Sequence, residues 1–341
     1  MNDTASSYSS ILTAVSYQLN IYFGSFLLVA GNLGCMGNII LFLSPTLRER
    51  AYSIYLLWEA ISDFLYFNFV LMTRVLQYGF KIPILTRYDV LCKLRQFLTD
   101  WSNQVSFSFF AFATIDRLLS TQRANKYRQW SNRADLALKI CLICVFVWLL
   151  LFGHRLILYS ATKGACIPLP GFYAYFDAYN EIFFKAICPP IVMIGLAHLL
   201  IRSVRGVIQR KVGLSDSKLP AIVACRSTID QIDSRLTLML ILQTIIALIT
   251  YIPFAIQLIY SNITQHWPKS TLRNAQESVF AQLTHLLSYT FFATSFYISI
   301  ITNVGFRRQI KKFFKKSRLN DRSTNTNAAF RADLTITMHT K

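Results

Sequence analysis

Asp116-Arg117-Leu118 closes the third of seven long apolar stretches in the sequence, and Cys92 lies 25 residues before the arginine. An adjacent acid and base at the end of a membrane helix are costly to bury, which favours a functional interpretation. Because disulfides persist only in oxidising compartments, a cysteine at the other end of the same stretch is typical of an outward-facing end. The stretch therefore predicts a membrane helix with one oxidising face and one reducing face.

The composition predicts an all-α membrane protein. The chain of 341 residues is 54% hydrophobic and only 15% charged, whereas soluble domains carry about 25% charged residues. Its apolar stretches reach the roughly 18 residues that indicate a membrane-spanning helix. We expect a seven-transmembrane helix bundle over residues 21–303. The expected spans are Ile21–Leu43, Ile54–Thr73, Leu94–Leu119, Ala137–Tyr159, Ile182–Ile201, Leu236–Tyr260 and Val279–Thr302.

The formal net charge of +19 would suit nucleic acid, but the positions of the basic residues favour a membrane topology. Arg and Lys gather in alternate connections between the spans and after the last span, and residues 1–19 contain none. This is the positive-inside pattern. It predicts a multi-pass plasma-membrane protein with an extracellular N-terminus, in contact with the lipid bilayer and not with nucleic acid.

Glycosylation sequons and cysteines agree with this orientation. Asn2 and Asn262 each begin an Asn-x-Thr motif, and both lie in segments that the charge pattern places outside. Of the seven cysteines, only Cys92 and Cys166 fall in outer segments. We therefore expect a disulfide between these two.

The segments beyond the spans are short. Residues 1–20 are expected to form a polar extracellular tail. In residues 304–317, Phe306 and Ile310 belong to an apolar repeat of three- and four-residue spacing between basic residues, which predicts a C-terminal amphipathic interfacial helix. A basic stretch that only sets topology is the alternative, but it does not explain the spacing. Residues 318–341 are polar and are expected to form a disordered cytoplasmic tail.

The longest connection, Arg202–Asp233, joins the fifth and sixth spans. Gly213 and Pro220 interrupt it, and these residue types commonly end or begin helices. We expect the two spans to continue into the connection as helices from either side.

The spans together resemble the rhodopsin-like G-protein-coupled receptors. The resemblance covers about Ile21 to Phe314, and it is specific in the joint order and spacing of its marker residues. These are Gly37-Asn38, Asp63, Cys92, Asp116-Arg117, Trp148, Pro190, Pro253 and Phe306-Arg307. The lead-in Cys92-Lys-Leu-Arg and the run that begins at Pro189 look similar to invertebrate neuropeptide receptors.

The resemblance implies a switch at the inner end of the bundle. Asp116 and Arg117 match the family's pair that couples to a heterotrimeric G protein. Asp233 stands where the family places an acidic partner for that arginine at the base of span six. A solvated loop aspartate is the alternative for Asp233. Arrestin and a receptor kinase are further partners that the resemblance implies.

The sequence departs from the family at three switch positions. Tyr251 replaces a tryptophan two residues before Pro253, and His198 replaces a tyrosine eight residues after Pro190. His198 is either a pH-sensitive switch or a hydrogen-bonded substitute. Ser295–Ser299 stands in place of Asn-Pro-x-x-Tyr, which leaves open whether the usual switch in span seven operates.

Asp63 lies in the middle of an apolar span, where an aspartate is a functional residue by default. The resemblance implies that Asp63, Ser106 and Asn38 hold an allosteric sodium ion. A water-bridged polar network is the alternative, and the altered span seven favours it. No other cofactor is expected.

The ligand is inferred by exclusion. Span seven has no lysine for a retinal Schiff base, and Thr99 stands where amine receptors carry an aspartate. Asp100 is one position further, which rotates it by about 100° on a helix. Thr99 and the aromatic and acidic residues near the outer mouth are the expected ligand pocket. The aromatic and acidic residues, including Asp100, Trp101, Tyr179 and Glu181, suit a cationic aromatic peptide such as an amidated Arg-Phe type. Interfacial aromatics of the membrane belt are the alternative.

Other classes of protein fit less well. The sequence has no catalytic triad, phosphate loop or metal cluster, so we do not expect an enzyme. A transporter would show paired repeats with helix breakers at the midplane, and a channel would show a re-entrant segment or a ring of charge. A receptor for a small non-peptide ligand is the nearest alternative to a peptide receptor.

Overall fold

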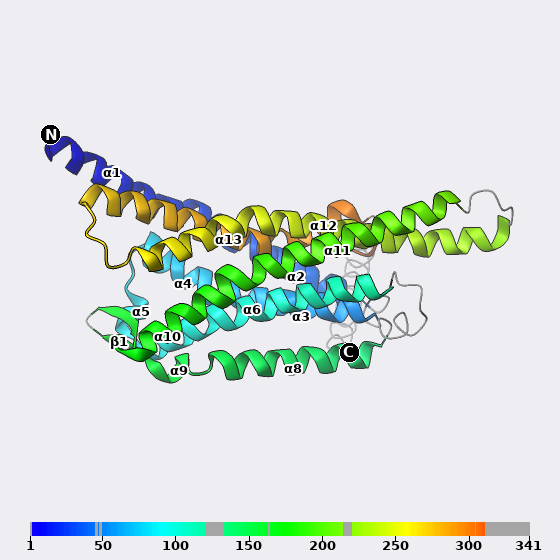
Figure 1. Ribbon diagram of the computed structural model, residues 1–341, viewed down its shortest axis with the longest axis horizontal. Helices are drawn as coiled ribbons and strands as arrows, with labels where there is room; N and C mark the ends of the chain where they lie inside the picture. The colour runs from blue at the N-terminus through cyan, green and yellow to red at the C-terminus, as the bar shows by residue number, and fades with distance from the viewer. Residues whose placement is uncertain are drawn as a thin grey trace, which may run out of the picture.

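A computed structural model of the protein describes residues 2–44, 47, 50–120, 133–162, 164–213, 220–303 and 305–310. Only the backbone is described for residues 2–6, 204, 206–213 and 220–234. Long helices run side by side along one axis and form a bundle (Figure 1). A short hairpin of strands lies at one end of the bundle, and the extensions of α11 and α12 project from the other.

Within the described part of the chain, the helices join into seven long segments. The first comprises α1 (Asn2–Leu19), η1 (Asn20–Gly24) and α2 (Ser25–Phe42). The second comprises α3 (Ala51–Leu65), η2 (Tyr66–Leu71), α4 (Met72–Arg74) and η3 (Val75–Gly79). After α5 (Ile84–Arg87), the third is α6 (Asp89–Ser120), and the fourth is α8 (Ala134–Phe152) with α9 (Arg155–Leu158).

The antiparallel hairpin of β1 (Tyr159–Thr162) and β2 (Ala165–Pro168) follows, with Tyr159 opposite Pro168. The fifth segment comprises α10 (Phe172–Glu181), η4 (Ile182–Ile187) and α11 (Cys188–Gly213). The sixth and seventh are α12 (Pro220–Ile263) and α13 (Thr271–Thr302). The four η segments are π-helical, so the helix is wider at each of them than an α-helix is.

Five of the described segments are long and apolar enough to cross a membrane, and these confirm an all-α membrane protein. They are Ser7–Phe42, Ala51–Gly79, Ala134–Leu158, Phe172–Ser203 and Arg235–Ile263. On α8, the exposed face carries Leu142, Ile143, Phe146 and Leu150, which suits contact with lipid and not with water.

Two helices that we also predicted as spans, α6 and α13, are each 32 residues long but more polar. Helix α6 contacts α3, α8 and α11, and α13 contacts α1, α2 and α12. The polar side chains of α6, such as Asn103 and Ser106, are buried against these neighbours. Polar side chains within membrane helices usually face the interior of the bundle, which explains the lower hydropathy of α6.

The N-terminal segment differs from our expectation. We predicted a short polar tail over residues 1–20, but residues 2–19 are helical, continue into the first span and pack along α13 (Figure 1). No Gly or Pro interrupts this stretch before Gly24. Asn20 fixes its end because its Nδ2 donates to the Ser16 carbonyl at 2.9 Å and to Gln282 Oε1 at 3.1 Å.

The segments at the opposite end follow the sequence more closely. Helix α11 ends at Gly213 and α12 begins at Pro220, as expected, and residues 214–219 lie outside the described residues. Residues 305–310 are helical, and the buried ring of Phe306 packs edge-on against Phe42 with 6.0 Å between centroids. The rest of the predicted interfacial helix, residues 311–317, lies outside the described residues, as does the predicted tail.

Close approach of the first two segments depends on Gly31. A Cβ atom placed there would lie 2.5 Å from Cζ of Phe67, whose ring is fully buried. We expect Gly31→Ala to lower the free energy of unfolding by about 1–3 kcal/mol through overpacking. Thermal unfolding in detergent micelles measures this.

Gly195 on α11 provides the matched control for that substitution. No atom lies within 4 Å of a Cβ placed there. Gly195→Ala should be neutral or slightly stabilising, since alanine loses less conformational entropy in a helix than glycine does. Equal unfolding midpoints for the Gly31→Ala and Gly195→Ala variants would contradict the close packing at Gly31.

Candidate functional site

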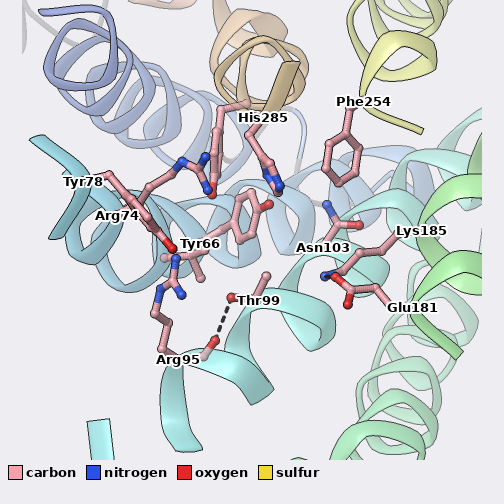
Figure 2. Close-up of a pocket in the computed structure, with 12 residues that line it drawn as sticks. Tyr66, Arg74, Tyr78, Arg95, Thr99, Asn103, Glu181, Lys185, Phe254 and His285 are labelled. Atoms are coloured by element: carbon pink, nitrogen blue, oxygen red, sulfur yellow. Dashed lines mark hydrogen bonds and ion pairs between the residues drawn. The ribbon is translucent and has the colours of Figure 1, made fainter. Parts of the chain in front are cut away.

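A cavity of about 190 Å³ lies inside the bundle, near the end where the hairpin is found (Figure 2). Its walls come from the second, third, fifth, sixth and seventh helical segments. The lining residues are Tyr66, Val70, Arg74, Tyr78, Arg95, Thr99, Asn103, Glu181, Lys185, Phe254, His285 and Tyr289.

The π-helical turns help to form this cavity. Tyr66, Val70, Tyr78 and Lys185 all belong to η segments. A π turn inserts an extra residue, which changes the direction of the side chains after it, and such turns are frequent at functional sites. Tyr66 is held from behind by the ring of Phe292, at 5.0 Å between centroids.

One wall of the cavity is basic. Arg74 is only 6% exposed, and its Nη2 donates to Gln282 Oε1 at 2.6 Å. Arg95 Nε donates to Thr73 Oγ1 at 3.1 Å. Within the described residues, neither guanidinium forms an ion pair with a carboxylate. Figure 2 shows both arginines on the same side of the cavity, with Tyr78 beside Arg74.

The opposite wall carries Lys185 and Glu181, whose charges compensate each other. Lys185 Nζ lies 2.7 Å from Glu181 Oε1 and also pairs with Asp100. Figure 2 places these two side chains across the cavity from the arginines. The lining therefore contains Arg74, Arg95 and Lys185 against one carboxylate, so the cavity is positive on its arginine side.

The predicted ligand residues are divided by the structure. Thr99 and Glu181 line the cavity. Asp100 does not line the cavity. It is buried behind the wall, where it pairs with both Lys185 and Arg155. Trp101 turns toward α8, where its Nε1 donates to the Val145 carbonyl at 3.3 Å. Tyr179 is 71% exposed and faces away from the bundle.

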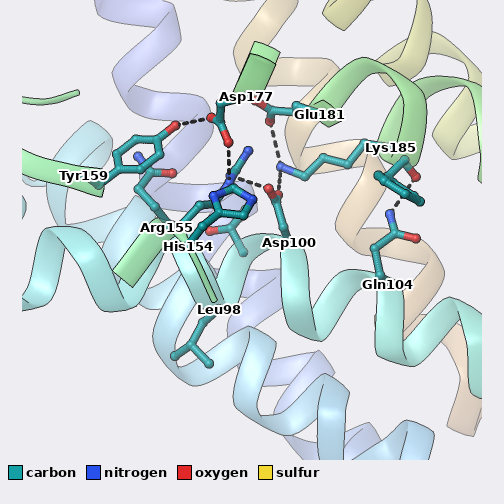
Figure 3. Close-up of polar contacts among 12 residues, drawn as sticks. Leu98, Asp100, Gln104, His154, Arg155, Tyr159, Asp177, Glu181 and Lys185 are labelled. Atoms are coloured by element: carbon teal, nitrogen blue, oxygen red, sulfur yellow. Dashed lines mark hydrogen bonds and ion pairs between the residues drawn. The ribbon is translucent and has the colours of Figure 1, made fainter. Parts of the chain in front are cut away.

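Arg155 is the centre of a buried charge network beside the cavity (Figure 3). Its Nη1 pairs with Asp100 on α6, and its Nε donates to Asp177 Oδ1 on α10 at 2.8 Å. The Tyr159 hydroxyl donates to the second oxygen of Asp177 at 2.6 Å. Asp100 also pairs with Lys185, so the network joins the third, fourth and fifth segments.

The predicted disulfide between Cys92 and Cys166 is confirmed. Its Cα atoms lie 5.6 Å apart, and the bond spans 74 residues of sequence. It fastens strand β2 to the first turns of α6, and Asp89 Oδ1 accepts a hydrogen bond from the Ala161 amide at 2.8 Å to fix β1 in the same place. We call this end of the bundle the disulfide end.

Asp116 and Arg117 lie at the opposite end of α6 and are both buried. Arg117 Nη2 is 3.2 Å from Asp116 Oδ2, and Arg117 Cζ lies 4.2 Å from the centroid of the Tyr52 ring on α3. The proposed counter-charge, Asp233, has a side chain outside the described residues. Its pairing with Arg117 stays a prediction.

The predicted ion site is assembled in part. Ser106 Oγ donates to Asp63 Oδ1 at 2.5 Å, and both side chains are buried. Asn38 instead donates to Ser295 Oγ at 3.2 Å, which ties α2 to α13. No group of three or more His, Cys, Asp or Glu side chains among the described residues is suited to a metal ion. Sodium binding therefore stays a prediction.

Glu59, one turn before Asp63, gives no clear signal of a partner in the sequence. In the structure it is buried, and its Oε1 accepts a hydrogen bond from Gln243 Nε2 on α12 at 3.2 Å. The hydrogen bond between Glu59 and Gln243 links the second and sixth segments. The hydrogen bond between Asp63 and Ser106 links the second and third segments in the same way.

Tyr251 lies directly beneath the cavity. Its buried hydroxyl donates to Oδ1 of Asn103, a lining residue, at 3.3 Å. Its ring packs edge-on against Phe107, with 4.9 Å between centroids. Pro253 lies within α12 two residues later. His198 is exposed on α11 and makes no hydrogen bond to the described residues, so it differs from the hydrogen-bonded substitute that we considered.

The two sequons are only partly described. Asn262 lies in the last turn of α12, and its Nδ2 donates to the Leu258 carbonyl at 2.9 Å. Asn2 begins α1, and its side chain lies outside the described residues. Glycosylation at both positions stays a prediction.

The basic wall was missed by sequence reasoning. Arg74 directly follows Thr73, the last residue of the predicted second span, so it was assigned to a connection. The helix in fact continues to Gly79. An arginine one residue beyond an apolar stretch was the available signal. No protein-family model and no curated protein matches the sequence.

Proposed function

We propose that the chain is a rhodopsin-like receptor of the plasma membrane that binds an extracellular ligand in the cavity and signals to a heterotrimeric G protein. Helix α6 supports this proposal because it connects the cavity with the predicted switch. The same helix lines the cavity with Thr99 and ends in the buried Asp116-Arg117 pair. Thr99 and Arg117 are 18 positions apart, which is about 27 Å along a helix.

The proposed topology has seven spans, with α6 and α13 added to the five apolar ones. The disulfide end faces outward, because disulfides persist in oxidising compartments. The basic connections and residues 304–317 then face the cytoplasm. In this orientation the cavity lies in the outer half of the bundle, and Arg117 faces the G protein.

Aromatic contacts connect the cavity with the interior of the bundle. Asn103 in the cavity wall accepts a hydrogen bond from Tyr251, whose ring contacts Phe107. Phe107 stacks on Phe291 of α13 at 5.0 Å, and Phe291 packs edge-on against Phe110. A ligand that binds one arrangement of these rings more tightly would shift the equilibrium between resting and active states.

The size of the cavity bears on the ligand. Ligand pockets usually measure about 300–1,000 Å³, so a cavity of about 190 Å³ accommodates a small molecule or one end of a peptide. We propose an extracellular neuropeptide that inserts its terminus. A small non-peptide ligand is the second candidate, and the volume favours it directly.

Arg117→Ala should abolish ligand-stimulated G-protein activation, because the buried guanidinium at the inner end would be lost. The test is a G-protein activation assay in cells expressing the receptor, challenged with a neuropeptide library. Nucleotide exchange on a purified G protein, measured with the receptor in nanodiscs, checks the basal rate. Surface expression is measured in parallel.

Arg133→Ala is the matched control for Arg117→Ala. Arg133 is an exposed arginine that precedes α8 at the same end of the bundle. Its loss should leave the response intact. A full response from Arg117→Ala receptors would contradict the proposed switch. Current through the expressed protein in the absence of a G protein would instead indicate a channel or transporter.

A further inference from the structure

We infer that the cavity selects a ligand bearing an oxyanion, a carboxylate being the smallest such group, and that Arg74 and Arg95 bind it. This inference rests on the proposed function only in taking the cavity as the ligand site. It changes the chemistry of the expected ligand, since the aromatic and acidic mouth in the sequence favoured a cationic, amidated peptide.

Arg74 is incompletely bonded within the described residues. Its side chain is more than nine-tenths buried and lines the cavity, yet its Nε is buried without a hydrogen-bond partner. Its Nη2 donates to the neutral amide oxygen of Gln282. Burying a charge is costly unless an opposite charge and hydrogen bonds compensate for it. The described residues around Arg74 provide hydrogen bonds but no opposite charge.

A second cation, Arg95, lies on the same wall of the cavity. Arg95 also lines the cavity and donates to the neutral hydroxyl of Thr73. Two cations that face one cavity repel each other, and an anion between them would relieve that repulsion. The pair therefore favours an anionic occupant more strongly than either arginine alone.

The two acidic residues in and behind the cavity wall are already paired with other cations. Glu181 is the carboxylate among the lining residues, and Lys185 already binds it at 2.7 Å. Figure 2 shows Glu181 and Lys185 across the cavity from both arginines. Asp100 is engaged by Arg155 and Lys185 in the network behind the wall (Figure 3). Neither acid is placed to neutralise Arg74.

The rest of the cavity lining indicates what kind of group would be attached to the anion. Tyr66, Tyr289, Phe254 and His285 provide aromatic surface next to the basic wall. A guanidinium presents a planar fork of donors that matches a carboxylate or a phosphate. Aromatic walls beside such a fork suit a compact aromatic or apolar body attached to the anion. An aromatic carboxylic acid and the free C-terminus of a peptide both have this chemistry.

The test compares acids with their amides on the purified full-length receptor in nanodiscs. The probes are phenylacetate and indole-3-acetate, their two primary amides, inorganic phosphate, and a set of Phe-terminated dipeptides with free or amidated C-termini. Binding is measured as a shift of the thermal unfolding midpoint across a concentration series. We expect acids to raise the midpoint and amides to leave it unchanged.

The arms identify the source of the anion. Binding of dipeptide acids more tightly than phenylacetate would indicate a peptide terminus, and the reverse would indicate a small organic acid. Binding of inorganic phosphate alone would indicate a phosphorylated ligand. No acid-specific shift from any probe, or equal shifts from acids and amides, would overturn the inference.

Arg74→Gln and Arg95→Gln should each weaken acid binding by about tenfold or more, as expected for the loss of a charge-assisted hydrogen bond. Arg95→Lys keeps the charge and should lose less. Arg87→Gln, at an exposed arginine of α5 near the same end, is the control and should bind acids normally. Unchanged acid affinity in both glutamine variants would also overturn the inference.

The binding assay does not require signalling. Acid-specific binding without G-protein activation would contradict the proposed function and leave the anion site intact. Activation by a cationic peptide with no acid binding would do the opposite.

Discussion

Arg155→Met will lower the free energy of unfolding by about 3–5 kcal/mol, as expected when one partner of a buried ion network is removed. Arg155 is among the largest fully buried side chains of the described protein. Its guanidinium compensates Asp100 on one side and Asp177 on the other. Without it, Lys185 alone would remain to neutralise the carboxylates that the network buries. The measurement is the thermal unfolding midpoint of the purified protein.

A second substitution separates charge from packing. Asp177→Asn keeps an oxygen that can accept the hydrogen bond from the Tyr159 hydroxyl. It also removes the negative charge that Arg155→Met would leave without its partner. Combined with Arg155→Met, it should recover part of the lost stability, because the charge left without a partner is what costs energy. Arg87→Met, at an exposed arginine, serves as the control. A midpoint for Arg155→Met equal to that control would show that the network contributes nothing.

Removal of the disulfide is expected to have the second-largest effect. A bond between Cys92 and Cys166 closes a loop over a sequence separation of 74. The chain-entropy relation gives about 4 kcal/mol for a loop of this length. The double variant Cys92→Ser, Cys166→Ser should therefore unfold at a clearly lower temperature. It should also bind ligand less tightly, because the Cys92–Cys166 bond fastens β2 beside the first turn of α6, near Arg95.

Cys188→Ala is the control for this experiment, since Cys188 is a free and partly exposed cysteine. It should behave as the native chain does. A reducing agent should lower the midpoint of the native protein and leave the double variant unchanged. A native protein that is insensitive to reduction would contradict a stabilising role for the bond.

Local signals in the sequence predicted much of the bundle. Hydropathy alone marks Ala137–Tyr159, which corresponds to α8 and α9. The Cys92–Cys166 bond was predicted because these are the two cysteines in the expected extracellular segments. Gly213 and Pro220 predicted where α11 ends and α12 begins. These features depend on properties of neighbouring residues or on the side of the membrane, so no knowledge of packing is needed.

The cavity was predicted only in part. Thr99 and Glu181 were placed correctly near the disulfide end, but Asp100 was expected in the cavity and is instead paired with Arg155 and Lys185. Spacing on one helix gives the angle of a side chain about that helix. It does not identify the residue on another helix that meets it, and Asp100 and Arg155 are far apart in sequence.

The sequence by itself determined the membrane class, the position of the disulfide and the acid-base pair at the end of α6. The tertiary structure alone decided the basic character of the cavity and the helical form of residues 2–19. Arg74 faces the cavity because helix η3 continues the second segment past its apolar stretch to Gly79. Residues 2–19 lie along α13. Both results depend on contacts between distant segments, and such contacts leave no local pattern in the sequence.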